Sequence, residues 1–208
     1  MPLVYQQNIN ESTKLAVWHI AEQEDFFLKE VMVSNNITHP HKRLQHLAGR
    51  YLLPELFEDF PLSLIQIADT RKPFLPDEAF HFSISHCGDY AAAIVSRTSR
   101  VGVDIEIISE KTQKIRDKFL SVEELEMIST QYPLIDTQLL TLAWSIKETM
   151  FKWYGAGGID FKKHLHIESI SQNDNQFVAS CIFQKNEPVH LKVHGLFFNN
   201  NYLTWLVS

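Results

Sequence analysis

Residues 100–109 have the sequence Arg-Val-Gly-Val-Asp-Ile-Glu-Ile-Ile-Ser. The alternation predicts a β-strand whose aliphatic side chains share one face, while Asp104 and Glu106 share the other. Two carboxylates one pleat repeat apart repel each other unless a cation lies between them. They indicate either a cation site or the solvent-exposed face of an edge strand, and the residue types alone leave both interpretations open.

Residues 144–152 have the sequence Trp-Ser-Ile-Lys-Glu-Thr-Met-Phe-Lys and predict a helix. Helical spacing places Trp144, Glu148 and Lys152 on one stripe. A third carboxylate and an amine could therefore reach the two carboxylates of the strand, a combination that suits a hard metal ion holding a phosphate. The alternative is an exposed Glu148–Lys152 ion pair, which is the commoner case for this spacing. Trp144 on the same stripe indicates a partly buried face instead.

The composition is that of a globular protein. The 208 residues fit one large domain or two small ones, and a hydrophobic content of 45% is enough for a packed core. A net charge of -6 argues against a general nucleic-acid binder, which needs a basic face. Cys87 and Cys181 are too few for a disulfide framework. Because the chain shows neither a signal peptide nor an apolar run of about 20 residues, we expect a soluble cytoplasmic protein without membrane contact.

Hydrophobic periodicity and turn residues predict helices and strands in both halves of the chain. Ser121 begins a Ser-Val-Glu-Glu sequence that predicts a capping box and a fresh helix start. A long helix in each half is followed by strands, which suggests two similar α+β halves meeting near residue 100. The predicted segments are a strand at 14–20, a helix at 40–57, a β segment at 63–68, a hairpin at 80–96, helices at 112–130 and 134–154, and strands at 164–170, 177–183, 189–198 and 202–208.

Basic residues in the first half suggest contacts with a ligand. The first long helix carries a basic cluster that could clamp a phosphate or simply face solvent. A second basic site, Arg71-Lys72-Pro73, lies in a predicted turn. His86 ends a strand beside a turn, and because Ser85 points to the opposite face, we expect a ligand contact rather than a Ser–His nucleophile. The basic cluster consists of His39, His41, Lys42, Arg43, His46 and Arg50.

The chain has no P-loop, no G-x-G-x-x-G, no G-x-S-x-G and no Cys/His metal spacing, so its two charged segments are its most specific motifs. Residues 102–106 and 144–152 resemble the two strongest motifs of the 4′-phosphopantetheinyl transferases, G-[VI]-D-[VI]-E and W-[ST]-x-K-E-x-x-x-K. Both are complete and have family-like spacing, and the chain resembles the longer, surfactin-type branch of the family.

Three further segments support this resemblance. Residues 48–53, 82–86 and 118–125 are similar to the family's first-helix arginine motif, its strand before the metal motif and its K-F-[FL]-S-x-x-E segment. The resemblance spans about residues 40–165. One departure is Arg71, which stands where the family usually has a glycine before Lys-Pro.

The resemblance implies an α+β fold of two pseudo-symmetric halves, each a small antiparallel sheet packed with a long helix. Residues 1–100 would form the half with the coenzyme A nucleotide contacts, and residues 101–208 the half with the metal site and the catalytic helix. The implied enzyme transfers the 4′-phosphopantetheine arm of coenzyme A to a serine of an apo acyl or peptidyl carrier protein and releases adenosine 3′,5′-bisphosphate. It would use Mg²⁺, with Mn²⁺ as the alternative, and would be a monomer.

The resemblance also implies the residues of the site. Asp104, Glu106 and Glu148 would bind the metal. Glu148, or a water on the metal, would deprotonate the carrier serine, and Lys152 would stabilise the charge on the phosphates, so both are implied catalytic residues. The residues implied to bind coenzyme A are Arg50, Lys72, Pro73, Ser85, His86, Lys147 and Lys152.

The partner and the function class leave alternatives open. Carrier proteins are typically acidic, as this chain is, so docking would need a local basic or apolar patch. A non-catalytic coenzyme A or nucleotide-binding protein of the same fold is the main alternative, and a metal-dependent phosphohydrolase that needs no carrier is another. The candidate docking patch, which could equally be a solvated face, consists of Lys111, Lys114, Arg116 and Lys118.

Overall fold

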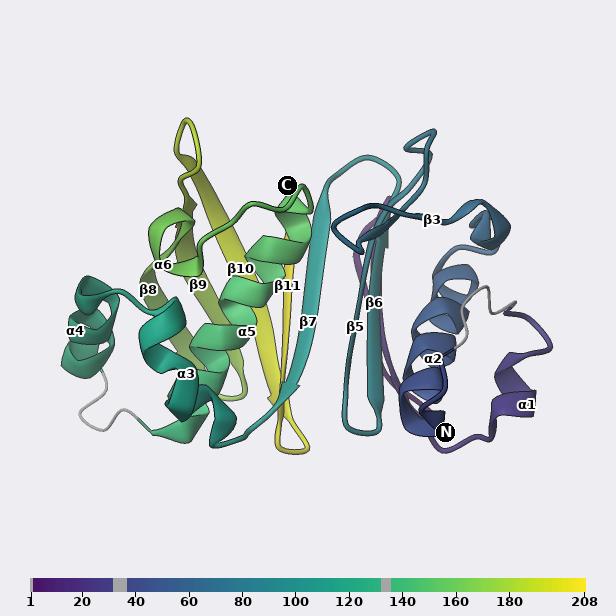
Figure 1. Ribbon diagram of the computed structural model, residues 1–208, viewed down its shortest axis with the longest axis horizontal. Helices are drawn as coiled ribbons and strands as arrows, with labels where there is room; N and C mark the ends of the chain where they lie inside the picture. The colour runs from purple at the N-terminus through teal and green to yellow at the C-terminus, as the bar shows by residue number, and fades with distance from the viewer. Residues whose placement is uncertain (1, 32–36, 132–135) are drawn as a thin grey trace.

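The computed structural model of the chain describes residues 2–31, 37–131 and 136–208. Its fold is α+β, with a four-stranded and a five-stranded antiparallel sheet side by side and a long helix against each (Figure 1). The strands are β1 (Leu3–Asn10), β2 (Thr13–His19), β3 (Gln66–Ile67), β4 (Pro73–Phe74), β5 (His81–Cys87), β6 (Tyr90–Ser96), β7 (Val101–Ile107), β8 (Leu165–Asn173), β9 (Gln176–Phe183), β10 (Val189–Phe198) and β11 (Asn201–Val207). The helices are α1 (Glu24–Phe27), α2 (Pro40–Leu56), the short 3₁₀ helix η1 (Leu62–Leu64), α3 (Lys111–Phe119), α4 (Val122–Gln131), α5 (Thr137–Tyr154) and α6 (Phe161–His164).

The first sheet has the strand order β1-β2-β6-β5, and α2 packs on its outer face. Pro40 occupies the first turn of α2, where its missing N–H costs nothing, and the side chain of His39 caps the helix by accepting from the N–H of Lys42. Leu47 and Leu52 of the helix are buried against the strands. This packing fixes the helix that carries the basic cluster.

The second sheet has the order β7-β11-β10-β9-β8, and α5 lies across it (Figure 1). The side chain of Asp136 caps the start of α5 by accepting from the N–H of Leu139. Gly155, with a φ of 71°, ends the helix in the left-handed conformation that favours glycine. The Trp144–Lys152 motif therefore lies within α5, with Lys152 in its last turn.

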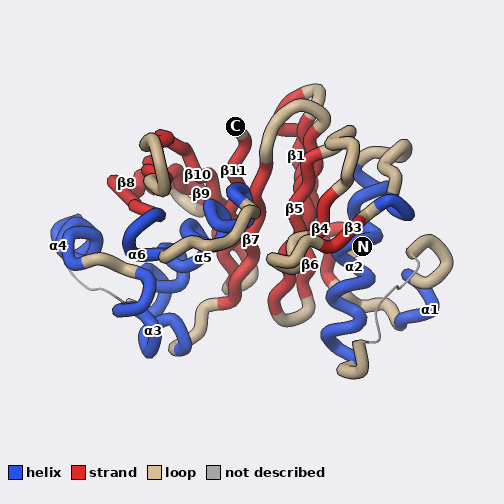
Figure 2. Tube along the Cα trace, turned by 45° about the horizontal axis from the view of Figure 1, so that its top comes forward, coloured by secondary structure: helices blue, strands red, loops and turns tan. Residues whose placement is uncertain are grey.

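The two sheets meet at their edge strands, β5 and β7, which face each other at the centre of the molecule in both views (Figures 1 and 2). An apolar core behind this junction joins the two sheets through Ile94, Val103 and Leu203, among other buried residues. The strand with Asp104 and Glu106 therefore lies between a sheet on one side and the opposite half of the molecule on the other.

Most predicted elements are present. The hairpin, the long helix of each half and the four C-terminal strands are confirmed, as is the capping box, in which Ser121 N–H donates to Glu124 Oε2 over 2.8 Å and Glu124 N–H to Ser121 Oγ over 3.2 Å. Residues 134 and 135 of the predicted second long helix lie outside the described residues. The predicted β segment at 63–68 is wrong in its first part, because Leu62–Leu64 forms a 3₁₀ turn before β3.

β1 was not predicted, since its polar residues dilute the apolar alternation. Within the described ranges, no helix combines the length and the apolar character required to cross a membrane.

Candidate active site

Asp104 lies at the centre of the junction and is 2% exposed, so the interpretation of its strand face as solvent-exposed is wrong. Its Oδ1 accepts hydrogen bonds from Ser85 Oγ at 2.8 Å and from Lys152 Nζ at 2.6 Å. Its Oδ2 accepts from Ser145 Oγ at 2.9 Å. The carboxylate thus receives donors from β5 in the first half and from α5 in the second. Charge-assisted bonds of this kind compensate the burial of an ionised group.

Lys152 connects the two halves at the same point. Its ammonium donates to Ser85 Oγ over 2.7 Å in addition to its ion pair with Asp104. The predicted alternative, an exposed ion pair with Glu148 one turn earlier on α5, is therefore wrong. Lys152 remains 24% exposed, so a ligand in the cleft can reach it.

Glu106 is held at both of its oxygens. Oε1 accepts from the indole Nε1 of Trp144 at 3.2 Å, and Oε2 from Cys87 Sγ at 3.5 Å. Burial, and then the charge of Asp104, raise the pKa of Glu106. The Trp144 bond confirms that the helical stripe faces the strand.

Glu148 is the third carboxylate at this place. Within the described residues it makes no hydrogen bond or ion pair, although Asp104, Glu106 and Lys152 all act on it electrostatically. Burial and then the charge of Asp104 raise the pKa of Glu148 to about 7. The charges of Lys152 and Lys111 oppose this shift, so two ammonium groups act at a site with three carboxylates.

A glycine brings α5 close enough to β7 for these groups to meet. At Gly102, a Cβ atom would collide with the carbonyl oxygen of Thr149 and lie 2.9 Å from the backbone nitrogen of Trp153. The glycine of the strand motif is thus required for helix–strand clearance. A larger residue would move the helical Glu148 and Lys152 away from Asp104.

The chemistry of the three carboxylates fits a hard divalent cation, but their arrangement is not that of a bound metal. Among the described residues, no group of three or more His, Cys, Asp or Glu side chains is arranged to hold a metal ion. Asp104 accepts from Lys152 and Ser145, and Glu106 accepts from Trp144 and Cys87, contacts that leave lone pairs on the carboxylate oxygens. Buried carboxylate oxygens in mutual repulsion are nevertheless the ligand type that Mg²⁺ prefers.

Basic side chains from the first half lie near the carboxylates. The rings of His86 on β5 and His46 on α2 are 5.4 Å apart, and Arg50 Nη1 lies 3.3 Å from His46 Nδ1. Desolvation by the surrounding groups, followed by the charges of His46 and Lys152, lowers the pKa of His86 to about 4 although its side chain keeps an exposed surface, so the imidazole is neutral at pH 7. The rest of the basic cluster is partly engaged elsewhere, since Arg43 forms a 2.6 Å ion pair with Glu24.

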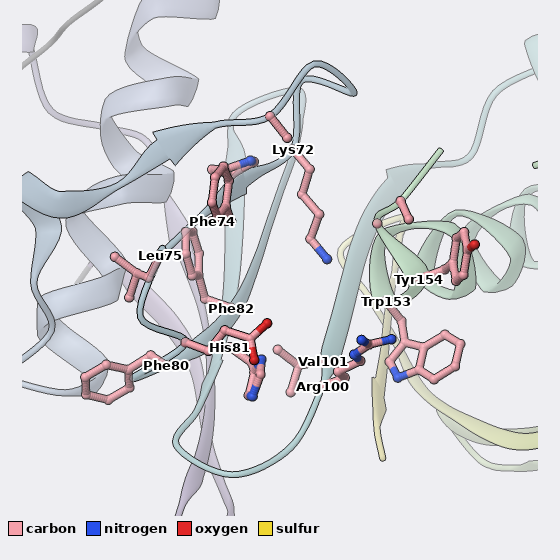
Figure 3. A pocket seen from close by; sticks show the side chains of 15 residues that line it. Lys72, Phe74, Leu75, Phe80, His81, Phe82, Arg100, Val101, Trp153 and Tyr154 are labelled. Carbon is pink, nitrogen blue, oxygen red and sulfur yellow. The ribbon is translucent and has the colours of Figure 1, made fainter. Parts of the chain in front are cut away.

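Lys72 reaches across the cleft from the loop before β4 (Figure 3). Its Nζ donates to the carbonyl oxygen of Lys152 over 2.8 Å, near the end of α5. Together with Pro73 it lines two cavities of about 280 and 210 Å³ between the halves, the first of which also contains Arg100. Burial and then the charge of Arg100 lower the pKa of Lys72.

Arg71 keeps the turn that a glycine would form. Its φ of 66° lies in the left-handed region, which costs a residue with a side chain free energy that glycine does not lose. The departure from the usual glycine therefore preserves the path of the loop, and the following Lys72 still points into the cleft.

The prediction that Lys147 contacts coenzyme A does not agree with its position. Its side chain is 0% exposed, and its ammonium donates to Glu124 Oε2 at 2.7 Å and to the carbonyl oxygens of Phe119 and Phe161 at 2.6 and 3.0 Å. The stripe of Trp144, Glu148 and Lys152 faces the cleft, whereas Lys147 faces away from it. We therefore assign Lys147 a structural role that ties α5 to α4 and α6.

Two residues of the site were not predicted. Ser145 bonds to Asp104, and Cys87 bonds to Glu106. Ser145 is part of the helical motif, so its position was a usable signal. Nothing in the local sequence distinguishes Cys87 from an ordinary half-buried cysteine.

Comparison with known proteins agrees with this site. Residues 100–205 match the family model described as the 4′-phosphopantetheinyl transferase superfamily. Enterobactin synthase component D of Salmonella austin is 38% identical over 115 residues, 53% of this chain and 47% of the relative. The protein of that name in Escherichia coli K12 is 33% identical over 153 residues, 70% of this chain and 68% of the relative.

A 4′-phosphopantetheinyl transferase of Bacillus subtilis is 34% identical over 122 residues, 59% of this chain and 52% of the relative. The chain spans about half the length of the Salmonella relatives that it matches.

Proposed function

This chain belongs to the 4′-phosphopantetheinyl transferase superfamily, and on that premise we propose that it transfers the 4′-phosphopantetheine arm of coenzyme A to a serine of an apo acyl or peptidyl carrier protein. The observation that carries the proposal is the contact of Lys152 with both Asp104 and Ser85, which joins the two halves of the molecule at a cluster of carboxylates. Phosphoryl transfer depends mainly on positioning and on stabilisation of charge, and this cluster offers both.

Asp104, Glu106 and Glu148 would hold Mg²⁺, or Mn²⁺ as the alternative. When bound, the cation would neutralise charge on the pyrophosphate of coenzyme A and favour the ionised form of all three carboxylates. The present pairing of Asp104 with Lys152 gives the cluster a partial counter-charge. We infer that Lys152 turns from Asp104 toward the phosphates when the substrate enters, because the ammonium is exposed enough to do so.

In the proposed reaction, the hydroxyl oxygen of the carrier serine attacks the phosphorus that bears the pantetheine arm. The bond from that phosphorus to the bridging oxygen breaks, and adenosine 3′,5′-bisphosphate leaves. Glu148 accepts the serine proton, a role consistent with a carboxylate that has no hydrogen-bond donor among the described residues. Lys152 stabilises the negative charge that develops on the phosphate oxygens.

The nucleotide end of coenzyme A would lie along the first half, within residues 1–100. Arg50, His86 and Lys72 would contact its phosphates, with Pro73 forming part of the wall. Ser85 would exchange its bond to Asp104 for one to the pyrophosphate. The cavities beside Lys72 and Pro73 supply space for this end of the substrate.

We also propose that residues 101–208 act as the metal-binding and catalytic half, and that the enzyme acts as a monomer in the cytoplasm. The carrier would dock on the exposed lysines of α3. Reversing the charges of Lys114 and Lys118 should raise the KM for the carrier without changing the KM for coenzyme A. An unchanged carrier KM would remove α3 from the docking surface.

The central test is incubation with coenzyme A, Mg²⁺ and a panel of apo carriers, followed by intact-mass measurement of each carrier. We expect a gain of one phosphopantetheine group on at least one carrier and none without Mg²⁺. Binding of coenzyme A without modification of any carrier would instead indicate a non-catalytic binding protein. Release of adenosine 3′,5′-bisphosphate without a carrier would indicate a phosphohydrolase.

A further inference from the structure

The seam between the two sheets is built from side chains on one side and backbone on the other. β5 and β7 are the edge strands of their sheets. Three side chains of β5 at every second position accept the backbone N–H groups of three alternate residues of β7. The contacts are Val103 N to Ser83 Oγ at 3.2 Å, Ile105 N to Ser85 Oγ at 3.2 Å and Ile107 N to Cys87 Sγ at 3.4 Å. We call these three contacts the seam rungs.

Two of the three seam rungs also hold a carboxylate. The Ser85 rung donates its hydroxyl proton to Asp104, and the Cys87 rung donates its thiol proton to Glu106. The Ser83 rung makes no contact with a carboxylate within the described residues. Two seam rungs therefore lie at the carboxylates and one lies away from them. The Ser83 rung serves as the control for the other two, because it lies on the same strand.

Cys87 fixes the direction of the Glu106 side chain together with Trp144. The thiol acts on Oε2 from the first half, and the indole acts on Oε1 from the second half. The sulfur is itself held by the N–H of Ile107, the residue after Glu106, so its proton is left to point at the carboxylate. A carboxylate restrained at both oxygens by different elements cannot rotate freely, and groups that orient ligands in this way tune metal affinity.

We propose that Cys87 is a positioning residue that orients Glu106 for cation binding. The inference rests on the proposed function in one respect, that Glu106 is a ligand of the divalent cation. It assigns Cys87 no contact with coenzyme A or with the carrier. The thiol acts only through the carboxylate that it holds.

The test is a titration of the purified full-length chain with Mn²⁺, in which free Mn²⁺ is measured by electron paramagnetic resonance without turnover. Cys87→Ala should raise the dissociation constant for Mn²⁺ by about 10-fold or more, the range seen when a group that orients a ligand is removed. Cys87→Ser should restore part of the affinity, because a hydroxyl can accept from Ile107 and donate to Glu106, although its oxygen lies closer to the backbone than the sulfur does. Ser83→Ala, which breaks a seam rung without a carboxylate, should leave the affinity unchanged.

Unfolding in urea, measured on the same three variants, separates positioning from general damage to the seam. Equal Mn²⁺ affinities for Cys87→Ala and wild type, or an equal loss for Cys87→Ala and Ser83→Ala, would overturn the inference while leaving the transferase proposal intact. A wild-type chain that does not bind Mn²⁺ and does not modify any carrier would instead overturn the metal-dependent function itself.

Discussion

Lys147 and Lys152 are little more than one turn apart on α5, and each forms an ion pair with a carboxylate, yet their surroundings differ in charge balance. Lys147 is fully buried and uses its ammonium on one carboxylate and two carbonyl oxygens. Lys152 is 24% exposed and stands among three carboxylates. Removing one partner of a buried pair is strongly destabilising, because the other charge is left uncompensated. A cluster in which carboxylates outnumber the nearby ammonium groups favours the binding of a cation.

The first prediction concerns the buried ion pair of Lys147 with Glu124. Lys147→Met leaves Glu124 charged and 4% exposed without its cation, which should lower the free energy of unfolding by about 3–5 kcal/mol. Burial lowers the pKa of Lys147 while Glu124 opposes that shift, so the pair depends on both partners. Urea denaturation measures the change. The double variant Lys147→Met/Glu124→Gln should recover part of the loss, and a single variant as stable as wild type would refute a structural role.

The second prediction concerns Lys152, which lies at the carboxylate cluster. Lys152→Met should reduce carrier modification by about 10²–10³-fold, since it removes a cation positioned where charge develops. It should also lower the free energy of unfolding, because Asp104, whose side chain is 3% exposed, loses its cation. Lys152→Arg serves as the control that keeps the charge. Modification rates from intact-mass time courses and urea denaturation of both variants provide the measurements, and wild-type turnover by Lys152→Met would exclude the proposed role.

The third prediction uses pH to test the buried surroundings of Glu148. Glu148 has a pKa of about 7, above its ordinary value of 4.5, so the folded state holds the proton more tightly than the unfolded state. Its contribution to stability is therefore full below pH 4.5 and falls as the pH rises to about 7. In Glu148→Gln this part of the pH dependence should vanish, as measured by urea denaturation from pH 4.5 to 8 without divalent cations. An identical pH profile for the variant and wild type would contradict the assignment.

The fourth and smallest effect concerns the loop that meets the end of α5 near Lys152. Arg71→Gly removes the cost of a left-handed φ but adds flexibility to the unfolded chain, so we expect a gain in stability below about 1 kcal/mol. Arg71→Ala keeps the backbone cost and should show no gain. Thermal unfolding of the two variants distinguishes backbone strain from a role of the guanidinium, which an equal effect of both substitutions would indicate.

The sequence predicted the elements better than it predicted the partners of their side chains. The spacing of Trp144, Glu148 and Lys152 was sufficient to place them on one face, and Asp104 lies opposite that face as expected. Lys147 is a lysine of the same motif as Lys152, but it is buried against residues of α4 and α6. The spacing of residues within α5 contains no information about these contacts with other helices. The capping box identified Glu124 as a local partner of Ser121 without revealing its longer-range partner.

The location of Cys87 could not be predicted for a related reason. The hairpin fixes the residue at the end of β5, whereas its contact with Glu106 exists only because two different sheets place their edges together. Equally, the pseudo-symmetry of the two halves stays a prediction, while the α+β class is confirmed.

The seam also has a consequence for self-association. An open sheet edge is a template on which another chain can add a strand, and proteins normally cover or interrupt such edges. Here β5 and β7 cover each other, so each half keeps the edge strand of the other from pairing with another chain. Separating the chain near residue 100 would uncover both edges at once, and each fragment would then be prone to pair with copies of itself.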